Sequence, residues 1–324
     1  MSDLLSIETR GRRRNMLRSA MGPAIVQALD EPEVVEILVN PDGCLWLDRQ
    51  GAGRARAGVV LTPHEVDRII RLVASYVRLE ASQKCPIVSA ELPETGERFE
   101  GLLPPVTAAP CFAIRKPAVT AIRLEDYVAA GIMTPAVAKI LADAVLAARN
   151  ILVAGGTGSG KTTLANALLA EIAALAARVI TIEDTRELYC TAKDAVALRT
   201  KPGVATLADL VRSTLRLRPD RIVVGEVRGA EALDMLKAWN TGHPGGIATV
   251  HANSARAALY RLEQLIQEVV IAVPRHLIAQ AIDLVVFIVG RGSRRRIQTV
   301  AEVKGIGPDG DYVLTTLSDT PNIS

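Results

Sequence analysis

The sequence is poor in aromatic residues and carries little net charge. Aromatic side chains make up 3% of the 324 residues, and 38 Lys+Arg against 35 Asp+Glu leave a net charge of +3. Proteins that bind single-stranded nucleic acid usually combine a basic groove with stacking aromatic side chains. This composition therefore argues against a nucleic-acid motor, and no sequence-specific contact with nucleic acid is expected.

Cysteine pairs and long apolar runs are also missing. The four cysteines are scattered and form no C-x-x-C pair, which argues against a structural zinc site and against a disulfide framework. A reducing cytoplasm is the simplest location. No run reaches the roughly 18 apolar residues that a spanning helix needs, and charged residues interrupt the first 14 positions. We therefore predict neither a membrane-spanning helix nor a signal peptide.

The length of the chain suggests two domains, and with 49% hydrophobic residues each can bury its own core. Short strands, turns and one well-capped helix in the first third predict a small α/β domain over residues 1–116. Pro117 disfavours helix before it and begins a predicted linker over residues 117–132. The second predicted domain covers residues 133–324.

The second domain contains the most informative stretch of the chain. An apolar strand, residues 151–154, runs into a glycine-rich turn that fits G-x-x-x-x-G-K-[ST] and is followed by a helical segment. This is the context that a phosphate-binding P-loop requires. Backbone N–H groups of such a turn form an anion-binding nest at a helix N-terminus. The residues expected to bind nucleotide here are Gly155, Gly156, Thr157, Gly158, Ser159, Gly160, Lys161, Thr162 and Thr163. Lys161 would reach the β- and γ-phosphates, and Thr162 would bind Mg²⁺.

Strands and helices alternate after the P-loop, which predicts a mostly parallel sheet with helices on both faces. Ligands of such sheets bind at the carboxyl ends of the strands. The predicted strand ends carry Glu183, Glu226 and His251 beside the P-loop. This set suits ATP hydrolysis, which needs Mg²⁺ to be held and a water molecule to be oriented.

We assign provisional roles to these strand-end residues. Glu226 follows a β-branched run, with Gly225 where a second carboxylate often stands, and would hold Mg²⁺ through water. Glu183 is then available to orient or deprotonate the attacking water, although the sequence leaves open which glutamate is the general base. His243 and His251 would sense the γ-phosphate.

Three segments carry a resemblance to a known family. They read TIEDTREL (residues 181–188), LRLRPDRIVVGEVRGAEALDML (215–236) and TGHPGGIATVHANS (241–254). They resemble the Asp box, Walker B box and His box of the secretion traffic ATPases of type II and type IV systems. The absence of a four-cysteine zinc module favours the conjugative branch.

The resemblance implies a hexameric ATPase with a RecA-like C-terminal domain, whose nucleotide lies between the two domains. It implies ATP and Mg²⁺ as ligands, and Arg115 and Arg123 as the arginines that reach the phosphates. It also implies inner-membrane components of a conjugative type IV secretion apparatus as partners. The location implied is the cytoplasmic side of the inner membrane, with peripheral association allowed.

Three alternatives stay open at this point. A pilus or type II secretion motor would share the same boxes. A RecA-type nucleic-acid motor would need a basic groove, for which the late cluster Arg291, Arg294, Arg295 and Arg296 is the available candidate. We interpret that cluster as a hairpin turn at the domain surface. A small-molecule kinase would need an acceptor pocket and a lid, and the sequence indicates neither.

Overall fold

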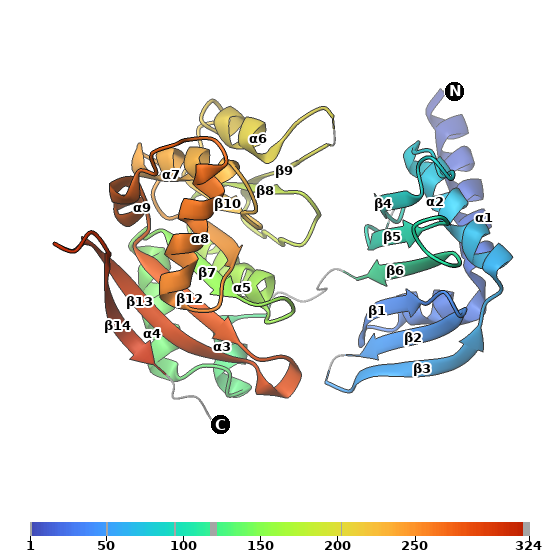
Figure 1. The fold of residues 1–324 in the computed structure, drawn as a ribbon, viewed down its shortest axis with the longest axis horizontal. Helices are drawn as coiled ribbons and strands as arrows, with labels where there is room; N and C mark the ends of the chain where they lie inside the picture. Colours follow the sequence, from blue (N-terminus) through green and yellow to red (C-terminus); the bar gives the residue numbers. More distant parts are fainter. Residues whose placement is uncertain (1, 50, 94, 117–121, 202, 320–324) are drawn as a thin grey trace. The chain divides into compact units, whose positions relative to one another are not determined.

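The computed structural model describes residues 2–49, 51–93, 95–116, 122–201 and 203–319. It divides into two compact units, residues 1–119 and 120–324, coloured from blue to green and from green to red in Figure 1. Each unit has its own hydrophobic core. The first five residues of the predicted linker, residues 117–121, lie outside the described residues.

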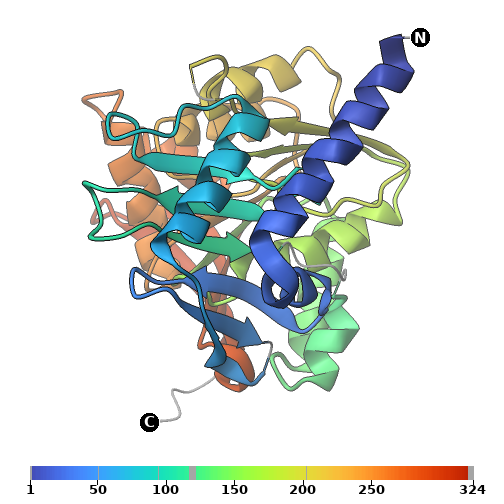
Figure 2. The same cartoon turned by 90° about the vertical axis from the view of Figure 1, so that its right-hand side faces the viewer.

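The first unit is a sheet with two helices on it. The sheet has the order β3-β2-β1-β6-β5-β4, and its neighbouring strands are antiparallel. The two helices lie side by side in front of the sheet in Figure 2. The elements are α1 (Ser2–Asp30), β1 (Val34–Val39), β2 (Cys44–Arg49), β3 (Gly53–Val60), α2 (Pro63–Val77), β4 (Ile87–Glu91), β5 (Arg98–Leu102) and β6 (Cys111–Arg115).

Local sequence explains why α2 begins where it does. The Thr62 hydroxyl accepts from the Glu65 N–H at 3.3 Å, and the Glu65 carboxylate accepts from the Thr62 N–H at 2.7 Å, so the predicted capping box is confirmed. The apolar face of α2 then packs into the core of the unit. The β3 strand was not predicted, because its sequence GRARAGVV is largely exposed and lacks an apolar face.

The second unit contains an eight-stranded sheet in the order β14-β13-β12-β7-β11-β10-β8-β9. The six strands from β12 to β9 are parallel, and β13 and β14 add an antiparallel edge. The strands are β7 (Ile151–Gly155), β8 (Arg178–Glu183), β9 (Asp194–Arg199), β10 (Arg221–Val224), β11 (Ile247–His251), β12 (Leu284–Val289), β13 (Arg296–Ile306) and β14 (Tyr312–Asp319).

Helices cover both faces of this sheet, as expected. They are α3 (Leu124–Ala129), α4 (Pro135–Leu146), α5 (Lys161–Ala173), α6 (Leu207–Thr214), α7 (Glu231–Asn240), α8 (Ala255–Gln267) and α9 (Arg275–Ala281), with a 3-10 turn at Gly292–Arg294. The strand β7 is central and fully buried. Its residues 151 and 153 pack with α3, α4 and α5, and its residues 152 and 154 pack with α6 to α9. This alternation places the P-loop at the centre of the carboxyl edge.

The helix α3 changes the domain boundary. The sequence assigned residues 117–132 to a linker, but Leu124 and Tyr127 are buried in the same core as α4 and α5. The short α3 therefore belongs to the second unit, as its position beside α4 in Figure 1 also shows. The sequence did not indicate α3, because a six-residue helix gives too little apolar periodicity to detect.

Within the described ranges, no helix combines the length and the apolar character needed to cross a membrane.

Candidate active site

The P-loop forms as the sequence predicts. The strand β7 ends at Gly155, and α5 begins at Lys161 after a turn in which Gly158 and Gly160 have φ of +74° and +96°. These left-handed conformations favour glycine. The Lys161 side chain is 7% exposed, and its Nζ donates to the Gly156 carbonyl at 3.1 Å. The ammonium group thus folds over the loop whose N–H groups are to receive phosphate.

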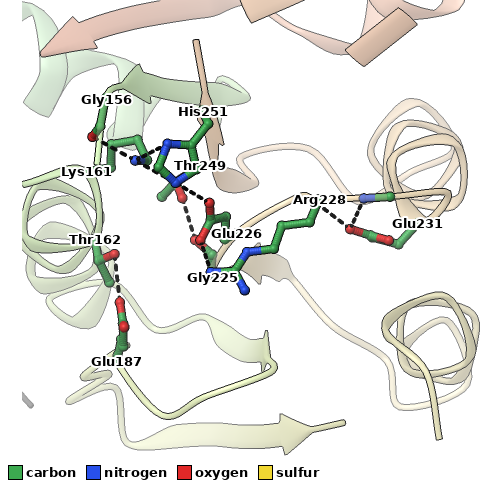
Figure 3. A network of polar contacts seen from close by, with 11 residues as sticks. Gly156, Lys161, Thr162, Glu187, Gly225, Glu226, Arg228, Glu231, Thr249 and His251 are labelled. Carbon is green, nitrogen blue, oxygen red and sulfur yellow. Dashed lines mark hydrogen bonds and ion pairs between the residues drawn. The ribbon is translucent and has the colours of Figure 1, made fainter. Parts of the chain in front are cut away.

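A chain of polar contacts extends from Lys161 along the carboxyl edge of the sheet, shown in Figure 3. Lys161 Nζ lies 3.4 Å from both ring nitrogens of His251, and His251 Nε2 lies 2.7 Å from Glu226 Oε1. The other oxygen of Glu226 accepts from Arg228. His251 reaches this position because β11 pairs with β7 in a register that places it beside Gly155.

The electrostatics of this chain favour a neutral imidazole. Burial lowers the pKa of His251, and the nearby Lys161 ammonium lowers it further, against an opposing effect of Glu226. A neutral ring can donate one N–H to Glu226 and accept from Lys161 with its other nitrogen. The arrangement therefore connects the Lys161 ammonium group to the Glu226 carboxylate through His251.

Glu183 has a different environment at the end of β8. Its side chain is buried, and Oε1 accepts from the backbone N–H groups of Glu187 and Leu188 at 2.8 and 2.7 Å. Burial raises its pKa to about 7, although these two hydrogen bonds lower it. A Cβ at Gly225 would lie 3.3 Å from Glu183 Cγ, which explains why glycine precedes Glu226. Glu183 thus shapes the loop that follows it.

That loop carries a site residue that we did not predict, Glu187. Its Oε2 accepts from the Thr162 hydroxyl at 3.0 Å, and its carbonyl accepts from Asn166 Nδ2 at 2.9 Å. Asn166 Oδ1 in turn accepts from the Tyr189 N–H at 2.8 Å, so the loop is fastened to α5. The sequence signal was present, since Glu187 lies in the TIEDTREL segment, but the strand-end rule selects only the residue at the strand end.

The contacts of Glu183 and Glu226 differ from those that the roles suggested by the sequence would require. Glu226, not Glu183, is in contact with His251 beside Lys161. The carboxylate beside Thr162, the predicted Mg²⁺ ligand, is Glu187. Arg228 is a second missed residue; its N–H donates to Glu231 Oε1 at 2.7 Å, which fixes the start of α7.

Two predicted nucleotide-binding residues lie away from the P-loop. His243 precedes β11, and its Nδ1 lies 3.0 Å from the carbonyl of Pro219, which precedes β10. It therefore sits at the amino edge of the sheet, away from the P-loop of the same chain, and its expected contact with the γ-phosphate stays a prediction. The rule about carboxyl ends did not apply to it, because it lies before its strand and not after it.

Arg123 also lies away from the phosphates. It precedes α3, where its N–H donates to Asp126 Oδ2 at 2.8 Å. Its charge acts on Glu171, whose pKa burial and Glu125 raise and Arg123 lowers. Glu171 lies near the end of α5, ten residues and about 15 Å from Lys161 at its start. Arg123 therefore lies away from the P-loop of this unit, and its expected role at the phosphates stays a prediction.

Arg115 belongs to the first unit, at the end of β6. Its side chain is half exposed, and its Nε lies 3.8 Å from Glu36 Oε1. Its role at the phosphates stays a prediction.

The late basic cluster is the β12–β13 turn, as predicted, but it is not a plain surface turn. Arg291 Nε donates to the Thr157 carbonyl of the P-loop at 3.1 Å. A guanidinium directed at the P-loop does not line a separate nucleic-acid groove, which weakens that alternative.

Metal ligation is consistent with this donor set. In the parts of the chain that the structure describes, no three His, Cys, Asp or Glu side chains cluster as a metal cage. Mg²⁺ is commonly held by one or two protein oxygens, substrate phosphates and water. The Thr162 hydroxyl and the Glu187 carboxylate fit that requirement, because both are hard oxygen donors and lie together.

The strand–loop–helix at the centre of a parallel sheet, with carboxylates and an imidazole beside its lysine, defines a P-loop nucleoside-triphosphate-binding protein. Residues 24–294 match the family model described as "Type II/IV secretion system protein". The chain belongs to this family.

Individual relatives agree with that assignment. The chain is 48% identical over 291 residues to the conjugal transfer protein TrbB of Rhizobium radiobacter, covering 89% of this chain and 90% of the relative. It is 34% identical over 308 residues to the type IV secretion system protein PtlH of Bordetella pertussis, with coverages of 83% and 90%. The fold is similar to the ATPase DotB of Legionella pneumophila, with a TM-score of 0.57, 19% identity and coverages of 90% and 78%.

Proposed function

We propose that this protein is a motor that hydrolyses ATP to ADP and phosphate and powers conjugative type IV secretion. The observation that carries the proposal is the contact chain from Lys161 through His251 to Glu226, next to the Thr162–Glu187 pair. Family membership and 48% identity to a conjugal transfer protein support the conjugative role. The parallel sheet with the P-loop at its centre supports a RecA-like assignment of the second unit.

In the proposed reaction, the P-loop N–H groups and Lys161 bind the β- and γ-phosphates. Glu226 orients a water molecule whose oxygen attacks the γ-phosphorus. The bond from that phosphorus to the bridging oxygen breaks, ADP leaves with the electron pair, and the water proton passes to Glu226. Arg228 holds one oxygen of Glu226 in place, and His251 holds the other oxygen on the side of Lys161.

Thr162 and Glu187 would hold Mg²⁺, with Glu187 acting directly or through water. When bound, the ion neutralises charge on the β- and γ-phosphates. Glu183 is a positioning residue in this scheme, because its carboxylate holds the N–H groups of the loop that presents Glu187.

We further propose a homo-hexamer that docks on inner-membrane components of the secretion apparatus, at the cytoplasmic side and without a spanning helix of its own. The relatives named as conjugal transfer and type IV secretion proteins support these partners. Arg115 of the first unit is proposed to reach the phosphates in the assembled ring. Electron microscopy of the purified protein with nucleotide tests the assembly, and a monomer under all nucleotide conditions would contradict it.

Phosphate release from ATP tests the activity. Lys161→Ala should abolish turnover, whereas Lys139→Ala, which removes an exposed lysine paired with Asp143, should leave it unchanged. If the Lys161 variant retains turnover, the proposal fails.

A second pair of variants tests the roles proposed for Glu226 and Glu187. Glu226→Gln should lower kcat by a factor on the order of 10² to 10⁴ while leaving ATP affinity nearly intact, because it removes the general base. Glu187→Gln should instead raise the Mg²⁺ concentration needed for half-maximal turnover. Identical Mg²⁺ titrations for the two variants would refute this division.

A further inference from the structure

The β12–β13 turn, residues 290–295, lies against the P-loop. The strand β12 is parallel to β7, on the side opposite β11, and pairs Ile288 with Gly155. The turn therefore leaves the sheet at the same edge as the P-loop. Gly290, with φ of +80°, makes it tight: a Cβ there would lie 2.0 Å from the Arg294 carbonyl oxygen. This backbone conformation thus places the residues after Gly290 against the P-loop.

Two arginines of this turn contact the glycines of the P-loop. Arg291 bonds the Thr157 carbonyl, and its Nε would lie 3.4 Å from a Cβ at Gly158. Arg295 lies closer still, since a Cβ at Gly160 would be 2.8 Å from its Nε and 2.9 Å from its Cζ. Both guanidinium groups are thus placed beside the backbone that forms the anion nest.

Arg295 has an unsatisfied donor at this position. Its Nε is buried and makes no hydrogen bond to any part of the chain that the structure describes. No described carboxylate forms an ion pair with it either. A buried cationic donor without an acceptor is costly, and the neighbouring P-loop is built to receive phosphate. The missing acceptor is therefore best supplied by an anionic ligand of that loop.

The position of the turn indicates which part of a bound nucleotide would lie beside it. The groups for the terminal phosphates lie on the other side of β7: Lys161 faces His251 on β11, and Thr162 faces Glu187 after β8. A nucleotide with its γ-phosphate at those groups extends its other end toward the flank formed by β12. The first charged group on that side is the α-phosphate.

We propose that Arg295 binds the α-phosphate of the nucleotide, with Arg291 holding the turn against the P-loop. This deepens the proposed function, on which it rests. A guanidinium offers parallel N–H donors that match phosphate oxygens. Because Arg295 would contact a phosphate and not the base, the contact would raise the affinity for nucleotides without distinguishing ATP from GTP.

Binding of a fluorescent ADP analogue, and its displacement by ATP and by inorganic triphosphate, tests the proposal. Arg295→Ala should weaken all three ligands by a similar factor, about 10- to 100-fold, the usual effect of a lost hydrogen bond to a charged group. Arg295→Lys should recover part of that affinity. Arg294→Ala is the matched control, because Arg294 belongs to the same turn and is exposed; it should bind as the parent does.

The outcomes separate this inference from the proposed function. If the parent binds and hydrolyses ATP and Arg295→Ala behaves like Arg294→Ala, the α-phosphate contact is refuted alone. A loss confined to ATP and ADP, with inorganic triphosphate unaffected, would assign Arg295 to the sugar or base and also refute it. If the parent itself binds no nucleotide, the proposed function fails. Circular dichroism spectra that match the parent show that each variant is folded.

Discussion

Glu183→Gln should stabilise the second unit at alkaline pH. The folded protein buries this carboxyl group, which raises its pKa from 4.5 to about 7. Between these pH values the folded state holds a proton that the unfolded state has lost, so folding weakens as the pH rises through the window. This loss of folding stability begins near pH 4.5 and is complete above pH 7. Glutamine keeps the Oε1 acceptor for the Glu187 and Leu188 N–H groups but cannot ionise.

The magnitude follows from the width of the window. Each unit of difference in pKa corresponds to about 1.4 kcal/mol, so the whole transition weakens folding by about 3 kcal/mol. Between pH 5 and pH 8 the parent should lose most of this, about 2 to 3 kcal/mol, whereas the Gln variant retains it. The side chain is 6% exposed, so solvent screening reduces this little.

Urea unfolding of the protein without Mg²⁺ or nucleotide measures the difference. The chain has two tryptophans, and in a Trp46→Phe background the buried Trp239 reports the second unit alone. Asp184→Asn is the control, because Asp184 is the exposed neighbour and bonds Thr200 at 2.8 Å; it should follow the parent at both pH values. A Gln variant whose advantage is the same at pH 5 and pH 8 would refute the reasoning.

Two further predictions concern packing around the same sheet. Asn150→Ala should destabilise the second unit by about 2 kcal/mol or more in the same urea assay. The Asn150 side chain bonds the Ala281 carbonyl and the Gly246 N–H, each at 2.8 Å, and its removal leaves both groups buried without a partner. Unchanged stability would mean that water replaces both bonds. Gly225→Ala should lower ATP turnover roughly tenfold. The added Cβ would lie 3.3 Å from Glu183 Cγ, so that it displaces Glu183 and misplaces the loop after it. An unchanged kcat would mean that this packing tolerates a methyl group.

Local patterns predicted the parts of the fold whose signal is contained in a short segment. The Thr62 capping box, the strand before Gly155 and the glycine-rich turn each involve neighbouring residues, so tertiary packing was not needed to read them. The alternation of strands and helices was enough to place Glu226 and His251 at one edge, because parallel strands share their carboxyl ends.

The contacts between these segments could not be read in the same way. Glu187 meets Thr162 only because the loop after β8 folds back onto α5 and is fixed there by Asn166. His243 stands close to His251 in the sequence, but β11 separates the two onto opposite edges of the sheet.

The sequence by itself determined the P-loop, the mostly parallel sheet and the family, since these depend on residue type at fixed local spacing. Only the tertiary structure decided which carboxylate lies near Lys161, which one lies beside Thr162, and that Arg291 and Arg295 face the P-loop. Those choices depend on strand order and on loops returning to the sheet edge. They bring together residues that are 25 to 134 positions apart along the chain, and no local pattern spans such a separation.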